Sequence, residues 1–195
     1  MDDLKIYAKE NKVPIILDGG LKFLLETITE NQVQTVLELG TAIGYSAIKM
    51  ASISPMIKID TIELNHDLYL EALSNIKNNN LGQQINCYNM NIDDFDTDKT
   101  YDLIFVDAAK AQYGKYLNKF QKNLNSGGIF FFDNIAFHGL VEHPELTKSR
   151  NTKQLVRKIK TFRDNILNNP NYECKFYPEI GDGIIILKMK KGDKI

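Results

Sequence analysis

Cysteine, net charge and long apolar runs are all scarce in this sequence, and each shortage excludes a class of protein. The 195 residues include two cysteines, Cys87 and Cys174, each inside an apolar, strand-like run. A disulfide-stabilised secreted domain carries more cysteine than this, so we expect two separate buried thiols. The formal net charge of −1 gives no global sign of nucleic-acid binding, although a local basic patch is compatible with it.

Targeting and membrane-spanning signals are missing as well. The N-terminal residues Met1, Asp2 and Asp3 lead into neither the basic nor the apolar run of a signal peptide. No apolar run approaches the roughly 20 residues of a membrane-spanning helix. With 43% hydrophobic residues and no repeat or linker, the chain is expected to form a single domain over residues 1–195, cytoplasmic and without membrane contact.

Hydrophobic patterning predicts alternating helices and strands. Two amphipathic helices are expected at 1–10 and 17–30, as a helical N-terminal cap over residues 1–30, with Asp18 capping the second. Asn65 is expected to cap a later helix. Strands are expected at 35–39, 59–63, 85–89, 101–106, 129–132, 172–177 and 184–189, and further helices at 45–52, 66–79, 112–123 and 150–168.

This alternation is typical of an α/β protein whose helices cover both faces of a parallel sheet. We predict a Rossmann-like fold with a seven-stranded, mostly parallel sheet in the order 3-2-1-4-5-7-6. A short Gly181-Asp182-Gly183 connection joins the last two strands, so these are expected to pair antiparallel at one edge.

A glycine-containing turn follows the first expected strand, where segment 37–46 reads LELGTAIGYS. Gly40 lets the backbone turn sharply and lets a ligand approach closely. The free N–H groups at the start of the next helix would face that ligand. The dinucleotide fingerprint G-x-G-x-x-G is not met, because Ala42 replaces its second glycine. The turn therefore favours a nucleoside without a pyrophosphate.

Acidic residues end the apolar runs of four expected strands, at Glu38, Glu63, Asp107 and Asp133. In open α/β sheets, ligands bind beyond these carboxyl ends. Glu63 is placed to accept hydrogen bonds from a ribose, and Glu38 would repel a phosphate but attract an ammonium group. Any one of the four has an ordinary reading as a loop or cap residue. The pair favours S-adenosylmethionine, which carries a ribose, an ammonium and a sulfonium, over NAD.

Three oxygen-bearing residues follow neighbouring strands and suggest a metal site. Asp107, Asp133 and Asn134 offer two carboxylates and an amide oxygen, a donor set that suits Mg²⁺ or another hard divalent cation. Helix capping is the alternative reading of these residues. Lys110 follows Asp107 by three residues, and could act as a base or neutralise a developing phenolate; otherwise it is a solvated lysine.

The segment from Lys148 to Arg163 carries seven basic residues and no acidic one. Such a run could bind a phosphate backbone. It could equally be a solvated helix face.

Several of these segments together resemble the metal-dependent, catechol O-methyltransferase-like class of adenosylmethionine enzymes. Segment 37–46, the DAAKAQY of 107–113 and Asp133-Asn134 carry this resemblance. Segments 8–15 (AKENKVPI), 133–141 (DNIAFHGLV) and 180–183 (IGDG) are similar to the bacterial tRNA 5-hydroxyuridine methyltransferases. That group makes 5-methoxyuridine at the tRNA wobble position.

The resemblance implies roles for particular residues, together with S-adenosylmethionine and Mg²⁺ as cofactors, the tRNA anticodon loop as partner and a homodimer. It implies Lys110 as the base, assisted by Asp107. Two departures from the family pattern are Met90-Asn91-Ile92 in place of Gly-Asp-Ala, and His138 in place of lysine. The expected cofactor contacts are Ile16, Glu38, Gly40, Ser46, Glu63, Met90, Asn91 and Asp107; the metal ligands are Asp107, Asp133 and Asn134; and the tRNA contacts are Arg150, Lys153, Arg157 and His138.

The sequence thus predicts a Mg²⁺-dependent O-methyltransferase of 5-hydroxyuridine in tRNA. A methyltransferase of small catechols or other vicinal phenols is the alternative within the enzymes. An NAD-dependent oxidoreductase is opposed by Ala42 and by the expected metal ligands. A non-catalytic RNA-binding module is opposed by the strand-end carboxylates, which would repel phosphate.

Overall fold

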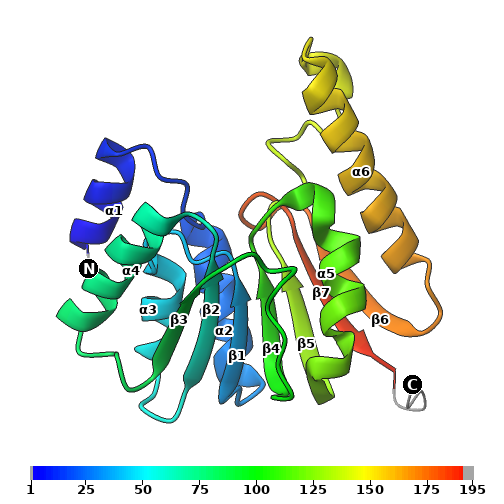
Figure 1. Ribbon diagram of the computed structural model, residues 1–195. Coiled ribbons are helices and arrows are strands. Elements are labelled where there is room, and N and C mark those ends of the chain that lie inside the picture. The colour runs from blue at the N-terminus through cyan, green and yellow to red at the C-terminus, as the bar shows by residue number, and fades with distance from the viewer. Residues whose placement is uncertain (1, 191–195) are drawn as a thin grey trace.

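A single twisted sheet runs through the molecule. The computed structural model describes residues 2–190, and its seven strands lie in the order β3-β2-β1-β4-β5-β7-β6, as Figure 1 shows. β7 runs in the direction opposite to the other six strands, which confirms the predicted order and hairpin. The strands are β1 (Thr35–Leu39), β2 (Lys58–Glu63), β3 (Ile85–Asn89), β4 (Tyr101–Val106), β5 (Leu124–Phe132), β6 (Tyr172–Tyr177) and β7 (Ile184–Met189).

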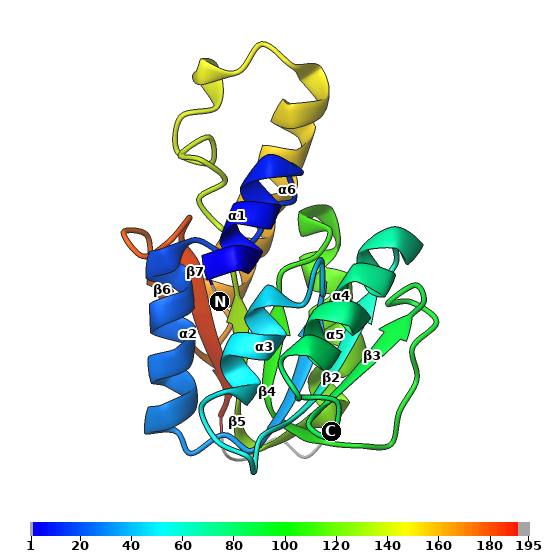
Figure 2. The same ribbon diagram turned by 90° about the vertical axis from the view of Figure 1, so that its left-hand side faces the viewer.

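Helices cover both faces of this sheet (Figures 1 and 2). Helices α2, α3 and α4 pack on one face, and α5 and α6 pack on the other. Three short 3₁₀ turns, at 110–112, 121–123 and 144–146, complete the helical part of the described chain. The α-helices are α1 (Asp2–Glu10), α2 (Asp18–Glu30), α3 (Tyr45–Ala51), α4 (His66–Asn78), α5 (Tyr113–Phe120) and α6 (Arg150–Leu167).

The central strands are buried on both faces, which explains their continuous apolar runs. In β5, Phe131 packs against the α2–α4 side while Phe130 and Phe132 belong to the α5–α6 side, because successive side chains of a strand point to opposite faces. Phe132 meets Phe162 of α6 edge-on, with ring centroids 5.0 Å apart. The two cores fix the helices relative to the carboxyl ends of the strands.

Some predicted boundaries were wrong. Strand β5 begins at Leu124 rather than 129, because it continues through Ser126-Gly127-Gly128 and pairs again with β4 after a register shift. The helix expected at 112–123 is α5 alone, flanked by 3₁₀ turns. Asp18 does not cap α2, whose N-cap is Leu17. The Asn65 cap is confirmed, since its side chain accepts hydrogen bonds from two backbone N–H groups of α4.

The two cysteines lie far apart. Cys87 is in β3 and Cys174 in β6, which form opposite edges of the sheet. Both are free thiols, as predicted, although each is only partly buried. None of the helices in the described range 2–190 is both long and apolar enough to cross a membrane.

Candidate active site

A cavity of about 630 Å³ opens at the carboxyl ends of the strands, and we call it the strand-end cavity. Its volume lies in the range of small-molecule sites. Its walls come from the α1–α2 connection, the turn after β1, the ends of β2 and β4, and the loop after β5. The predicted site residues that line it are Ile16, Gly40, Ser46, Glu63, Asn91, Asp107, Lys110, Asn134 and His138.

The turn after β1 approaches β4 so closely that only glycine fits. Gly40 has φ +102°, and a Cβ there would lie 2.3 Å from the backbone oxygen of Asp107. Glu63 holds the far side of the turn: Oε2 accepts the N–H of Ala42 at 2.8 Å, and Oε1 accepts the N–H of Asn65 at 2.8 Å. Glu63 therefore ties the turn to the start of α4 while it lines the cavity.

Glu38 is not in the cavity wall, which differs from the expected direct contact with an ammonium group. Its side chain is fully buried, and its two oxygens accept hydrogen bonds from the hydroxyls of Ser46 and Thr61. Burial raises the pKa of Glu38 to about 8, and the hydrogen bonds from Ser46 and Thr61 oppose this rise. Ser46, which does line the cavity, is the side chain that Glu38 orients.

Met90 also lies outside the wall of the strand-end cavity, in contrast to its neighbour Asn91. Its side chain is exposed on the surface. The chain turns after β3, so that Asn91 and Ile92 face the cavity while Met90 does not.

The predicted metal ligands follow two paired strands. Val106 and Phe132 are register partners in β4 and β5, so Asp107 and Asp133, the next residues, leave the sheet side by side. The N–H of Asp133 still bonds the oxygen of Val106 at 3.2 Å. Asn134 has φ +57°, a left-handed conformation that asparagine tolerates better than most residues, and lines the cavity.

Burial and mutual repulsion act on these carboxylates. Burial, followed by the nearby charge of Asp107, raises the pKa of Asp133 to about 7. Burial likewise raises the pKa of Asp107, while Lys110 opposes this. Two like charges, one of them buried, favour a cation between them. The donor set of two carboxylates and one amide oxygen thus fits a hard divalent cation.

The predicted metal ligands include fewer ionisable side chains than a metal site made only of His, Cys, Asp and Glu. Within residues 2–190, no group of three or more His, Cys, Asp or Glu side chains could hold a metal ion. The predicted site contains only two such side chains and depends on Asn134 for its third donor.

The chain matches the O-methyltransferase family profile over residues 7–190. It belongs to the O-methyltransferase family.

Solved structures of this family share the fold described above. A provisionally named caffeoyl-CoA O-methyltransferase from Staphylococcus aureus is 33% identical, covers 97% of this chain and 91% of its own, and superposes with a TM-score of 0.90. An O-methyltransferase from Bacillus cereus, solved in complex with SAH, is 24% identical, covers 96% of this chain and 88% of its own, and gives a TM-score of 0.79.

Two relatives in sequence carry names that indicate different kinds of substrate. Caffeoyl-CoA O-methyltransferase of Mesembryanthemum crystallinum is 26% identical over 178 residues, which are 86% of this chain and 68% of that enzyme. The tRNA1(Val) (adenine(37)-N6)-methyltransferase of Flavobacterium psychrophilum is 26% identical over 136 residues, 69% of this chain. The matched region spans only 56% of the length of that enzyme.

In this O-methyltransferase, Lys110 stands beside the carboxylate set. It begins the 3₁₀ turn before α5, and its Nζ lies 3.8 Å from Oδ1 of Asp107. The side chain is 22% exposed, so it is neither a solvated surface lysine nor a fully buried one. Lys110 can therefore reach a hydroxyl group held against Asp107.

Two supporting residues were given no role by sequence reasoning, although both lie in segments that carry the resemblance. Tyr113 is fully buried and donates from its hydroxyl to the backbone oxygen of Asp133 at 2.8 Å. Asp182, in the turn between β6 and β7, accepts the N–H of His138 at 2.6 Å. Its other oxygen, Oδ2, is buried and accepts no hydrogen bond within the described part of the chain, and it lies 3.5 Å from Nδ1 of His138.

This β6–β7 turn fixes the loop that begins with Asp133. Backbone N–H groups of Ile135 and Ala136 donate to the oxygens of Gly183 and Asp182. A Cβ at Gly183 would lie 2.7 Å from the nitrogen of Ala136. His138 is thereby held at the cavity with a largely exposed imidazole. The glycines flanking Asp182 were the only local signal of this contact.

The predicted tRNA contacts on α6 lie apart from the strand-end cavity. Arg150 and Arg157 are exposed and Lys153 is partly exposed, on a helix whose N-terminal half stands clear of the sheet in Figures 1 and 2. Not all of the basic run is free, because Arg163 is buried and pairs with Glu142 and Asp164.

Proposed function

We propose that this O-methyltransferase transfers the methyl group of S-adenosylmethionine to the 5-hydroxyl of 5-hydroxyuridine at the tRNA wobble position, with Mg²⁺ or a similar cation. The single observation that carries the chemistry is the convergence of Glu63, Asp107, Asn134 and Lys110 on one cavity. Membership of the family supports methyl transfer to oxygen.

The cofactor half of the proposal rests on the walls near β1 and β2. Glu63 would accept hydrogen bonds from the ribose, with Ile16, Gly40, Ser46 and Asn91 forming the rest of the wall. The B. cereus relative was solved with SAH, the product of this cofactor. Glu38 supports the site indirectly, by orienting Ser46.

The acceptor half rests on the walls near β4 and β5. Asp107, Asp133 and Asn134 would hold the divalent cation, which lowers the pKa of a coordinated hydroxyl and fixes its direction. 5-Hydroxyuridine offers that hydroxyl beside a carbonyl oxygen, as a catechol offers two neighbouring oxygens. Lys110 would take the hydroxyl proton or neutralise the resulting oxyanion.

The bond changes are those of an in-line displacement. The substrate oxygen would form a bond to the methyl carbon while the carbon–sulfur bond of the sulfonium breaks, and the electron pair of that bond would return to sulfur. The residues of the cavity contribute mainly alignment, which in such reactions supplies much of the rate. A wobble base lies in a single-stranded loop, so little unpairing energy is needed to insert it.

The RNA substrate is supported by the exposed cations of α6 and by the tRNA-modifying relative, which acts on a base of a tRNA. A small catechol or vicinal phenol remains the second candidate, because the plant relative acts on caffeoyl-CoA, as its name says.

The chain is further proposed to act as a homodimer, which sedimentation would test.

One assay separates the two substrates. Purified enzyme is given labelled S-adenosylmethionine and Mg²⁺ with either hydroxylated tRNA or a simple catechol. We expect label in the tRNA, recovered as 5-methoxyuridine after digestion to nucleosides, and we expect transfer to stop with excess chelator. Label in the catechol alone would replace the proposal with the small-phenol function.

A further inference from the structure

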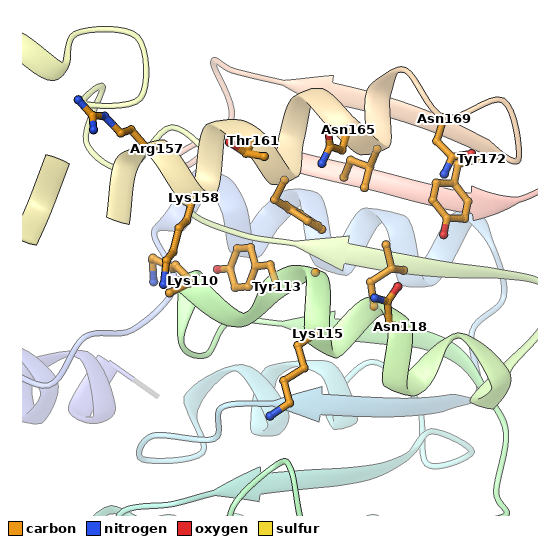
Figure 3. Close-up of a pocket in the computed structure, with 15 residues that line it drawn as sticks. Lys110, Tyr113, Lys115, Asn118, Arg157, Lys158, Thr161, Asn165, Asn169 and Tyr172 are labelled. Atoms are coloured by element: carbon orange, nitrogen blue, oxygen red, sulfur yellow. The ribbon is translucent and has the colours of Figure 1, made fainter. Parts of the chain in front are cut away.

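A second cavity lies between α5 and α6, beside the strand-end cavity. It has a volume of about 520 Å³, and we call it the α5–α6 cavity. Lys110 lines both cavities, so they adjoin at this residue. Figure 3 shows Lys158 of α6 reaching across toward Lys110, with Tyr113 next to them.

The charges along the α5–α6 cavity are all positive. Its lining includes Lys110, Lys115, Arg157 and Lys158, and no Asp or Glu. Lys115 is paired with Asp93, and Lys110 lies near Asp107. Arg157 and Lys158 are exposed and form no ion pair with any residue of the described chain. The end of the α5–α6 cavity near Lys158 therefore suits an anion.

The opposite end has a different chemistry. Asn118, Asn169 and Tyr172 gather there, away from Lys110 and Lys158 (Figure 3). Apolar side chains of both helices, among them Leu117, Phe162 and Ile166, form part of the lining. Aromatic rings and amides are the groups that stack on nucleic-acid bases and bond their edges. A bare anion would use only the cationic end.

We propose that the α5–α6 cavity binds the nucleotide that neighbours the methylated one in an RNA strand, with its phosphate at Lys158. This inference rests on the proposed function, because it takes the substrate base to occupy the strand-end cavity. Two cavities that share a lining residue, one for the reacting base and one for a phosphodiester-linked neighbour, fit a polynucleotide. A free catechol would leave the second cavity without a role.

The test measures RNA binding directly, without cofactor, cation or turnover. A fluorescent anticodon stem-loop RNA is titrated with the full-length enzyme and with the Lys158→Gln variant, and anisotropy is followed at several salt concentrations. Lys158 is exposed, so the variant is expected to fold. We expect about a 5-fold or greater loss of affinity at low salt, and a salt slope lower by the equivalent of about one neutralised phosphate.

Two matched variants make the result specific. Lys77→Gln removes one exposed charge from α4, on the other face of the sheet, and should leave affinity and salt slope unchanged. Lys158→Arg keeps the charge and should restore most of the binding. Equal losses in Lys158→Gln and Lys77→Gln would overturn the inference, since they would reflect net charge alone.

The remaining outcomes also decide the matter. Unchanged RNA binding in Lys158→Gln would overturn the inference, and a change of sedimentation instead would show that a second copy of the chain covers this cavity. The proposed function fails separately, when hydroxylated tRNA is not methylated. RNA binding that depends on Lys158 would still support the cavity assignment in that case.

Discussion

The strand-end cavity and the α5–α6 cavity differ in how their lining side chains are held. The first is lined by side chains with fixed partners: Glu63 is held by two backbone N–H groups. Asp133, behind the cavity wall, is almost completely buried. The second is lined at one end by exposed cations, Arg157 and Lys158, that form no ion pair within residues 2–190. Fixed groups suit chemistry that depends on alignment, whereas exposed cations suit attraction of a long polyanion.

The difference predicts that changes in the strand-end cavity abolish chemistry, while changes on α6 alter the choice of substrate. The largest effect is expected from Asp133→Ala. Loss of one of two carboxylates should reduce methyl transfer by more than about 100-fold, since even outer partners of a metal ligand are worth roughly 10- to 100-fold. Turnover as a function of Mg²⁺ concentration checks this, with circular dichroism to confirm folding. Full activity of the variant in excess chelator would show that methyl transfer needs no divalent cation.

The next largest effect is expected from Glu63→Ala. Loss of its hydrogen bonds should weaken S-adenosylmethionine binding by roughly 1–3 kcal/mol, and should loosen the turn that it holds at Ala42. Calorimetry of cofactor binding measures the change directly. Met90→Ala serves as the control, because Met90 lies outside the cavity wall. Equal affinities for the two variants would contradict the ribose assignment.

A smaller effect per residue is expected on α6. Neutral substitutions at Arg150, Lys153 and Arg157 should together lower tRNA affinity and flatten its salt dependence, by about 0.7–0.9 in the log–log slope for each phosphate that is no longer neutralised. Cofactor affinity should be unaffected. A fluorescence titration at several salt concentrations tests this, and an unchanged slope would mean that α6 is only a solvated face.

The smallest effect is a pH dependence of stability. Burial raises the pKa of Glu38 from 4.5 to about 8, so the folded state holds a proton that the unfolded state releases at lower pH. Its contribution to stability is complete below about pH 4.5 and is lost as pH rises toward 8. Glu38→Gln stays neutral, so its Tm should fall less than that of the parent over this pH range. Parallel Tm profiles would show that Glu38 is ionised in the fold.

The sequence predicted the strand-end cavity better than its supporting contacts. Asp107 and Asp133 were recognisable because each directly follows an apolar strand, and sheet order then made them neighbours. The burial of Glu38 was not predictable, because it depends on the Ser46 and Thr61 hydroxyls, which come from different elements. The contact of Asp182 with His138 was not predictable either, because the two residues lie 44 positions apart in the chain.

The α5–α6 cavity was less predictable still. The basic run from Lys148 to Arg163 was visible, but its composition did not reveal that Arg163 turns inward to Glu142. Nor did it reveal that Lys158 shares a cavity with Lys110. Which basic side chains remain free depends on the packing of α6 against α5 and β6, and residue spacing within one helix does not determine that packing.

The ratio of tRNA methylation to catechol methylation tests the central claim most directly. It is measured for the parent enzyme and for the variant neutral at Arg150, Lys153 and Arg157, with the same cofactor and cation. The account predicts that the ratio falls at least several-fold in the variant, because the strand-end cavity still performs the chemistry while RNA is held more weakly. An unchanged ratio, with tRNA methylation and its salt dependence intact, would contradict the claim that the strand-end cavity performs the chemistry while α6 holds the RNA.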